Sequence, residues 1–285
     1  MAERIEIVEV GPRDGLQNEP RPIATEDKIA LVDALSACGF ARIETASFVN
    51  PKAVPQMADG AAVMAGIARR AGTRYTALTP NMKGYEAARD AGVDEVAVFG
   101  AASESFSQRN INATIAESLE RFAPVLAAAK ADGIPVRGYV SCVVVCPYEG
   151  PVAPRAVAGV AEALAEAGAG EISLGDTVGQ GTPETIDAML DAVLMALPAE
   201  RLAGHFHDTN GRALESAATA FARGLRVFDA AAAGLGGCPF APGAAGNLGT
   251  GKLADWCEGE GIETGLDRAA LAAAEKLAAG LRPSR

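Results

Sequence analysis

The fold is decided at residues 5–17, which read IEIVEVGPRDGLQ. The first six residues of this stretch are mostly isoleucine and valine, and such a run is typical of a buried β-strand. The next residues include Arg13, Asp14 and Gln17, whereas the first strand of an open nucleotide-binding sheet is normally followed by a G-x-G-x-x-G turn. An open doubly wound sheet is therefore the alternative, and a (β/α)8 barrel is the predicted fold.

The rest of the chain repeats this unit, because β-rich runs alternate with longer alanine-rich runs of helical period. The expected strands are residues 5–10, 42–45, 74–78, 95–99, 136–142, 171–174, 202–206 and 227–230. The expected helices are residues 26–38, 59–70, 85–91, 114–131, 155–167, 183–196 and 213–223. No linker interrupts the series, so we expect one TIM-barrel domain over residues 1–285, with an extra C-terminal helix, Leu266–Ala279, outside it.

Glycine follows several of these expected helices, where its freedom to adopt a left-handed conformation ends a helix. The glycines in question are Gly39, Gly72, Gly92, Gly133, Gly168 and Gly224.

The composition is that of a packed globular protein with an excess of acidic residues. Of the 285 residues, 49% are hydrophobic, and the formal net charge of −11 argues against a general nucleic-acid-binding protein. The longest uncharged run, Ala230–Gly251, contains nine glycine or proline residues and indicates a loop, not a membrane span. The N-terminus lacks the apolar core of a signal peptide, and the five cysteines form no CxxC pair, so we expect reduced thiols and a cytoplasmic protein.

His205 and His207 are the only histidines in the sequence, and they lie at the end of an expected strand. Side chains two residues apart on a strand point to the same side, so both imidazoles are placed to bind one metal ion. Two hydrogen-bonded histidines at a strand end are the structural alternative.

Polar side chains collect at the carboxyl ends of the expected strands, where a barrel enzyme holds its active site. Together with the histidines, Asp14 and Asn247 would form a ligand set that suits Mg²⁺ or Mn²⁺. Arg13 could neutralise charge that develops on a substrate oxygen, or form a salt bridge to Glu44. The other polar residues at strand ends include Asn110, Arg137, Tyr139, Ser173, Asp176 and Thr177.

A glycine-rich stretch, residues 234–240 (GLGGCPF), predicts a loop that can close over a ligand and deliver the Cys238 thiol as a nucleophile or proton donor. An inert loop cysteine is the alternative. Residues 246–253 have the glycine and lysine spacing of a phosphate loop, but Leu253 stands where a magnesium-binding hydroxyl is needed, so a nucleoside triphosphatase is excluded. Cys142 and Cys146 lack a second ligand pair and are expected to be buried.

Nine stretches of the sequence, in unbroken order, match the pattern of a known family. They are Val8–Glu19, Ile43–Thr45, Ser47–Val49, Leu78–Asn81, Phe99–Glu104, Arg137–Cys142, Cys146–Gly150, Ile172–Thr177 and Ala233–Pro239. These stretches resemble 3-hydroxy-3-methylglutaryl-CoA lyase (HMG-CoA lyase), a metal-dependent TIM-barrel lyase of the wider DRE-TIM metallolyase group. The glycine-rich cysteine loop is the most specific of them.

The resemblance implies a role for each candidate residue. The implied ligands of Mg²⁺ or Mn²⁺ are Asp14, His205, His207 and Asn247. Arg13 would bind and polarise the substrate carbonyl, Cys238 would transfer protons, and Glu44 and Asp176 would orient groups or exchange protons. The substrate contacts or their supports would be Gln17, Asn110, Arg137, Tyr139, Ser173 and Thr177.

The implied reaction is the retro-Claisen cleavage of HMG-CoA to acetyl-CoA and acetoacetate, as in leucine degradation and ketone body formation. The implied partners are the acyl-CoA substrate and further copies of the chain in a dimer or tetramer, with no nucleic acid and no membrane.

The sequence departs from the family pattern at three places. Gly251 and Lys252 stand where an acidic pair is expected, Asn210 stands where tyrosine is common, and Ala231–Ala232 replaces a more polar run. Because these residues border the site, a longer or differently branched 3-hydroxy-acyl-CoA is an alternative substrate. A Claisen-type synthase is less favoured because the C-terminus leaves no room for a regulatory domain. A non-catalytic acyl-CoA-binding barrel is less favoured because no expected catalytic position is missing.

Overall fold

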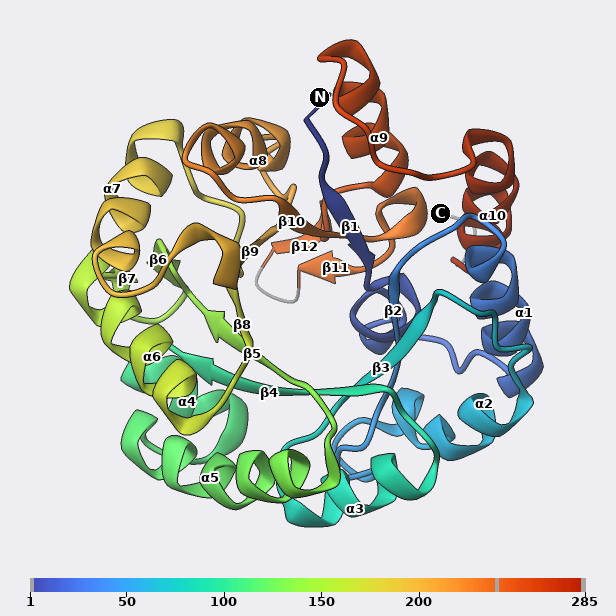
Figure 1. The fold of residues 1–285 in the computed structure, drawn as a ribbon, viewed down its shortest axis with the longest axis horizontal. Helices are drawn as coiled ribbons and strands as arrows, with labels where there is room; N and C mark the ends of the chain where they lie inside the picture. The colour runs from blue at the N-terminus through green and yellow to red at the C-terminus, as the bar shows by residue number, and fades with distance from the viewer. Residues whose placement is uncertain (1–2, 239–240, 283–285) are drawn as a thin grey trace.

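Eight parallel strands close into a barrel that a ring of helices surrounds (Figure 1). The computed structural model describes residues 3–238 and 241–282, and at residues 237–238 and 241–245 it describes only the backbone. In chain order the barrel strands are β1 (Glu6–Glu9), β2 (Arg42–Ser47), β3 (Arg74–Leu78), β4 (Glu95–Ala101), β5 (Val136–Ser141), β8 (Glu171–Asp176), β9 (Leu202–Phe206) and β10 (Val227–Ala230). Since β1 pairs with both β2 and β10, the sheet has no edge, and the predicted (β/α)8 barrel is confirmed.

All eight predicted helices form, with ends that differ from the expected ones by a few residues. They are α1 (Thr25–Ser36), α2 (Gly60–Gly66), α3 (Met82–Asp90), α5 (Ile115–Asp132), α6 (Pro154–Ala167), α7 (Pro183–Leu194), α8 (Ala213–Ala222) and α10 (Arg268–Leu281). The additional C-terminal helix is α10, and it packs against α1 outside the barrel (Figure 1). Short 3-10 turns, η2 (Pro55–Met57) and η3 (Ala199–Arg201), complete the outer layer.

Several short elements in the loops after the strands have no clear pattern in the sequence. They are the π-helical turn η1 (Gly11–Gly15), α4 (Glu104–Ile111), the β6 (Val145–Cys146) and β7 (Gly150–Pro151) hairpin, η4 (Ala232–Gly234), the β11 (Gly237–Cys238) and β12 (Ala241–Ala245) hairpin, and α9 (Thr250–Gly259). The helix α9 begins inside the stretch with phosphate-loop spacing, and there the Thr250 hydroxyl donates to Glu9 over 2.7 Å.

The six glycines predicted to end helices all have positive φ angles, from +72° at Gly133 to +118° at Gly168. An L side chain is strained in this region. Five of these glycines lie within three residues of a helix end, as predicted, but α2 already ends at Gly66, so the prediction that Gly72 ends a helix is wrong.

Apolar and charged side chains occupy different layers of the barrel. Leu31 on α1 and Leu164 on α6 are fully buried, as is Phe228 on β10. The neighbouring residue Asp229 is also buried, but it belongs to a polar network inside the barrel, because successive strand residues point to opposite faces. In the described part of the chain, none of the helices has the length and apolar character needed to span a bilayer.

Candidate metal centre and active site

Asp14, His205 and His207 lie together at the carboxyl ends of β1 and β9. Their candidate ligand atoms all lie within 4.8 Å of one another. The two Nε2 atoms of the histidines are 3.3 Å apart, and His205 Nε2 is 3.9 Å from Asp14 Oδ2. The structure therefore brings together three of the four residues that the sequence proposed as ligands.

The turn η1 places Asp14 next to the histidines. The backbone N–H groups of Arg13, Asp14 and Gly15 all donate to the carbonyl of Val10, so the chain turns sharply at the end of β1. A Cβ atom on Gly15 would lie 2.7 Å from the Cβ atom of Leu235, so only glycine allows this close contact with the chain that follows η4.

Asp229 on β10 fixes the orientation of the His205 ring. Its Oδ2 atom lies 2.9 Å from His205 Nδ1, which leaves Nε2 facing Asp14 and His207. Burial would lower the pKa of His205, but the adjacent Asp229 carboxylate raises it. Burial and the neighbouring His205 lower the pKa of His207 to about 4, so this imidazole is neutral and can donate its lone pair.

The Arg13 guanidinium lies between Asp14 and Glu44. Its NH1 atom is 2.5 Å from Asp14 Oδ1, and its Nε atom donates to Glu44 Oε2 over 2.7 Å. Burial would raise the pKa of Asp14, but Arg13 and the two histidines lower it to about 2. The predicted Arg13–Glu44 salt bridge forms, and it leaves Arg13 next to the candidate metal ligands.

Glu44 is almost completely buried, with Tyr139 as a second partner. The Tyr139 hydroxyl donates to Glu44 Oε2 over 3.2 Å, while Glu44 Oε1 has no hydrogen-bond partner among the described residues. Burial raises the pKa of Glu44 even though Arg13 opposes this effect. A buried carboxyl with an unused oxygen and a raised pKa has the properties of a proton-exchanging group.

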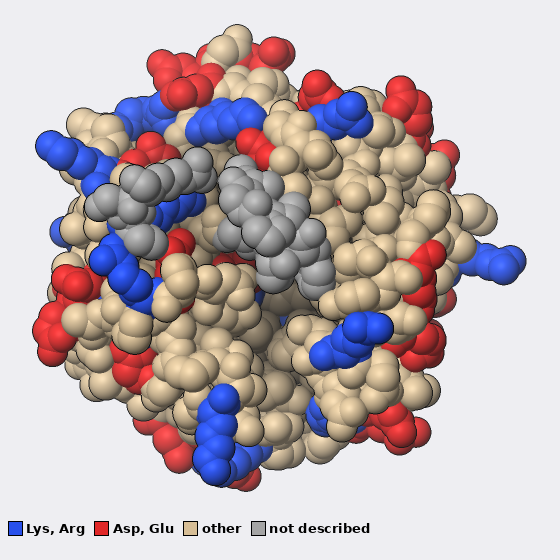
Figure 2. Space-filling model, turned by 180° about the vertical axis from the view of Figure 1, so that it is seen from behind, with Lys and Arg blue, Asp and Glu red and all other residues tan. Residues whose placement is uncertain are grey.

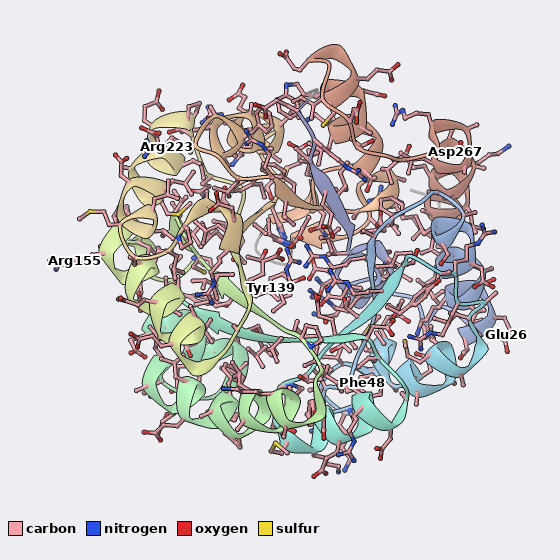
Figure 3. All side chains as sticks on the ribbon, in the orientation of Figure 1. Glu26, Phe48, Tyr139, Arg155, Arg223 and Asp267 are labelled. Carbon is pink, nitrogen blue, oxygen red and sulfur yellow. The ribbon has the colours of Figure 1, made fainter. Side chains whose placement is uncertain are left out.

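A series of ion pairs inside the barrel connects Asp229, next to His205, with residues at the amino-terminal ends of β2 and β8. Figure 3 shows Tyr139 inside the ring of strands. Arg137 NH2 lies 2.7 Å from Asp229 Oδ1, and Arg137 Nε donates to Glu171 over 2.7 Å. Glu171 also accepts two hydrogen bonds from Arg42 at the start of β2. Arg137 thus supports the residue that orients His205.

Three other candidate residues, Ser173, Thr177 and Asp176, form hydrogen bonds within the protein. Ser173 donates to Asp229 over 2.9 Å, and Thr177 accepts from the backbone N–H of Cys142 over 2.9 Å. Asp176 is buried at the end of β8 and accepts from Gly181 over 2.7 Å; burial raises its pKa.

Two predicted substrate contacts are less buried than Ser173 and Asp176. Gln17 is half-buried just after η1, and Asn110 is exposed on α4. The roles of both residues stay predictions.

Asn247 lies beside the cluster but presents its amide nitrogen to it. The Nδ2 atom donates to Asp14 Oδ2 over 2.9 Å and to the Leu235 carbonyl over 3.2 Å. A metal ligand would need the amide oxygen on this side, so its ligand role stays a prediction. The side chain of Cys238 lies outside the described residues.

The residues present fit a divalent metal ion. Two donor atoms bound at about 2.1 Å in adjacent octahedral positions lie roughly 3 Å apart, close to the separation of the two histidine Nε2 atoms. The donor set of one carboxylate and two imidazoles also suits such an ion. Figure 2, from the side opposite to Figure 1, shows a hollow near the middle of that face.

This chain was compared with protein-family models, curated proteins and solved structures. The model of the HMGL-like family matches residues 4–278. The chain belongs to the HMGL-like family. A curated relative from Pseudomonas aeruginosa, 3-hydroxy-3-isohexenylglutaryl-CoA/hydroxy-methylglutaryl-CoA lyase, is 55% identical over 271 residues, which cover 95% of this chain and 90% of the relative.

Two further members are similar over most of their length. The cytoplasmic 3-hydroxy-3-methylglutaryl-CoA lyase of Danio rerio is 56% identical over 263 residues, which cover 92% of this chain and 78% of the relative. The crystal structure of the HMG-CoA lyase from Brucella melitensis has a TM-score of 0.98 and 60% identity, with 99% of each chain covered. The resemblance noted in the sequence is confirmed.

Asp229 is the site residue of this HMGL-like chain that sequence reasoning missed. Its signal was a single carboxylate in the otherwise apolar β10 sequence, Val227–Ala230. A charged residue inside a barrel strand needs a buried partner, and here the partners are Arg137 and His205.

Asp229→Asn is expected to weaken Mn²⁺ binding by about ten- to a hundredfold, because the amide no longer holds the His205 ring with a charged acceptor. Calorimetric titration of the metal-free protein measures the change. Ser173→Ala removes another hydrogen bond to the same Asp229 oxygen and serves as the matched control, with an expected loss below about threefold. Equal affinities for wild type and Asp229→Asn would contradict the orienting role.

Proposed function

We propose that this chain is a metal-dependent carbon–carbon lyase that cleaves HMG-CoA to acetyl-CoA and acetoacetate. The observation that carries the proposal is the contact between Arg13 and Asp14, which sets a guanidinium beside the Asp14–His205–His207 cluster. The names of the relatives above support the same activity. The proposed metal ligands are these three residues and Asn247, with its amide turned over, and the proposed ion is Mg²⁺ or Mn²⁺.

The cleavage must remove a proton from the tertiary hydroxyl and stabilise the enolate that leaves. A divalent ion bound by the cluster would lower the pKa of the substrate hydroxyl. Arg13 is placed to donate hydrogen bonds to the oxygen on which the enolate charge develops, and Glu44 and Asp14 hold its guanidinium in place. Glu44, with its unused Oε1 atom, and Asp176 are the proposed groups that orient or exchange protons.

The other predicted residues complete the proposal. Arg137, Tyr139 and Ser173 act mainly as supports, because their polar atoms contact Asp229, Glu171 or Glu44 inside the barrel. The proposed contacts with the substrate are Gln17, Asn110 and Thr177.

An acyl-CoA with a longer branch is the second candidate substrate. The name of the Pseudomonas aeruginosa relative includes 3-hydroxy-3-isohexenylglutaryl-CoA, and the two proteins are 55% identical. Both thioesters contain the same reacting atoms, so the difference lies in the space for the branch. Measuring kcat/KM for both with identical metal tests the choice: we expect HMG-CoA to be cleaved, and cleavage of the isohexenyl compound alone would move the substrate assignment to the longer acyl group.

Cys238→Ala is expected to lower kcat by about a hundredfold or more while the bound metal per chain stays unchanged, because we propose that this thiol transfers a proton to the departing product. Metal analysis of the purified variant and a coupled assay of acetoacetate measure the two effects. Cys257→Ala, a change at a buried thiol on α9, is the matched control and should leave kcat nearly unchanged. Full activity of Cys238→Ala would remove the thiol from the mechanism.

We also propose a single catalytic domain, a homodimer or homotetramer and a cytoplasmic location, with roles in leucine degradation and ketone body formation. The four cysteines whose side chains are described, Cys38, Cys142, Cys146 and Cys257, are all free and buried, in keeping with a reducing compartment.

A further inference from the structure

Glu275 on α10 reaches from the outer layer of the barrel to the chain around the active site. Its Oε1 atom accepts from the backbone N–H of Ala233 over 3.1 Å and from that of Gly251 over 2.9 Å. Ala233 lies in η4, before the β11–β12 hairpin, and Gly251 lies in the first turn of α9, after it. One carboxylate oxygen therefore joins the two ends of the segment that carries Cys238 and Asn247.

The absence of a side chain at Gly251 makes room for this contact. A Cβ atom on Gly251 would lie 2.6 Å from Glu275 Oε2 and 2.8 Å from Oε1, both too close for a stable contact. An alanine at this position would therefore push the Glu275 carboxylate away from the two N–H groups.

Glu9, at the end of β1, holds the neighbouring residues. It accepts from the Ala232 N–H over 2.9 Å and from the Thr250 hydroxyl over 2.7 Å. Ala232 and Ala233 are consecutive, as are Thr250 and Gly251, so two carboxylates from different layers hold the same two chain segments.

The segment that Glu275 holds is under strain and leads directly into the site. Ala233 has a φ of +53°, a left-handed conformation that is unfavourable for alanine and that the surrounding contacts must maintain. Two residues later, the Leu235 carbonyl accepts from the Asn247 amide, which also donates to Asp14. A second bond, from the guanidinium of Arg282 directly after α10 to the Gly234 carbonyl, holds the same turn.

We propose that Glu275 is a positioning residue, which fixes both ends of the β11–β12 segment relative to the Asp14–His205–His207 cluster. The C-terminal helix is then part of the active-site framework as well as an outer packing element. The effect of Glu275 on turnover rests on the proposed lyase function, but its effect on the backbone of the segment does not.

Hydrogen exchange and steady-state kinetics on the full chain test this role with four variants. Glu275→Ala removes the acceptor, and Glu275→Gln keeps one acceptor oxygen. Gly251→Ala displaces the carboxylate without removing it, although alanine favours a helix more than glycine does. Lys276→Ala, at the exposed neighbouring position on α10, is the matched control.

For Glu275→Ala and Gly251→Ala we expect amide exchange in peptides covering 231–236 and 249–253 to become about tenfold faster. We expect kcat to fall about tenfold, with KM for HMG-CoA within about twofold of wild type, because displaced catalytic groups lower the rate of the bound complex. Glu275→Gln should restore most of the slow amide exchange and most of kcat, and Lys276→Ala should match wild type in both.

Faster exchange confined to α10, with normal exchange at 231–236 and 249–253, would overturn the proposal and leave Glu275 a contact of the outer layer. Wild-type exchange and kcat in Gly251→Ala would also overturn it, even if Glu275→Ala does not fold. If the wild-type protein does not cleave HMG-CoA, the proposed function fails, and the exchange measurements alone still decide the positioning role.

Discussion

Arg13→Met is expected to lower kcat for HMG-CoA cleavage by about a thousandfold while metal binding changes far less. The reason is that Arg13 is the buried cation beside the cluster, and losing a preorganised donor to a developing oxyanion typically costs a factor of about a hundred to a thousand. Arg13→Lys should stay strongly impaired, because a single ammonium cannot reproduce the fork that bonds to Glu44 and Asp14 together. Steady-state kinetics with metal analysis measure both properties.

A second variant tests whether the loss of activity follows only from a loss of stability. Arg13→Met leaves Glu44 buried without its cation, which costs stability. The double variant Arg13→Met/Glu44→Gln removes that buried charge and should melt at a higher temperature than the single variant, yet remain inactive. If the double variant recovered activity along with stability, Arg13 would have only a structural role.

His207→Ala is expected to lower the affinity for Mn²⁺ by at least about a hundredfold and to abolish turnover at micromolar metal. The imidazole of His207 is neutral, and its Nε2 atom faces that of His205. The substitution therefore removes one of the three donor atoms of the cluster. Electron paramagnetic resonance of free Mn²⁺ during titration gives the affinity directly.

Asp208→Asn is the matched control for His207→Ala, because Asp208 is adjacent in sequence but bonds to Lys252 over 2.9 Å and to the start of α8. We expect its Mn²⁺ affinity to remain within about threefold of wild type. Unchanged Mn²⁺ affinity in His207→Ala would show that the two histidines do not form a metal site.

The sequence was sufficient to predict the barrel because its signals are local. Runs such as Arg74–Leu78 and Leu202–Phe206 have strand composition, and glycines such as Gly168 end helices where the backbone needs a positive φ. The short elements α4 and η1 were missed because hydrogen bonds to Ser103 and to the Val10 carbonyl stabilise them, and not a run of apolar residues.

Part of the candidate site could also be predicted from the sequence. Asp14 and the two histidines follow strands whose ends meet in a barrel, so their proximity could be foreseen. The orientation of His205 by Asp229, and the reach of Glu275 into η4, depend on contacts between residues far apart in the chain. Such contacts leave no periodic trace in a single sequence.

We propose that the Asp14–His205–His207 cluster holds the ion on which cleavage of HMG-CoA depends. The most direct measurement is a titration of metal-free protein with Mn²⁺, in which bound metal and acetoacetate formation are followed in the same samples. We expect no product without metal and a rate that rises in proportion to bound Mn²⁺, up to one ion per chain. Full cleavage by the metal-free protein, or a fully loaded protein that releases no acetoacetate, would contradict the account.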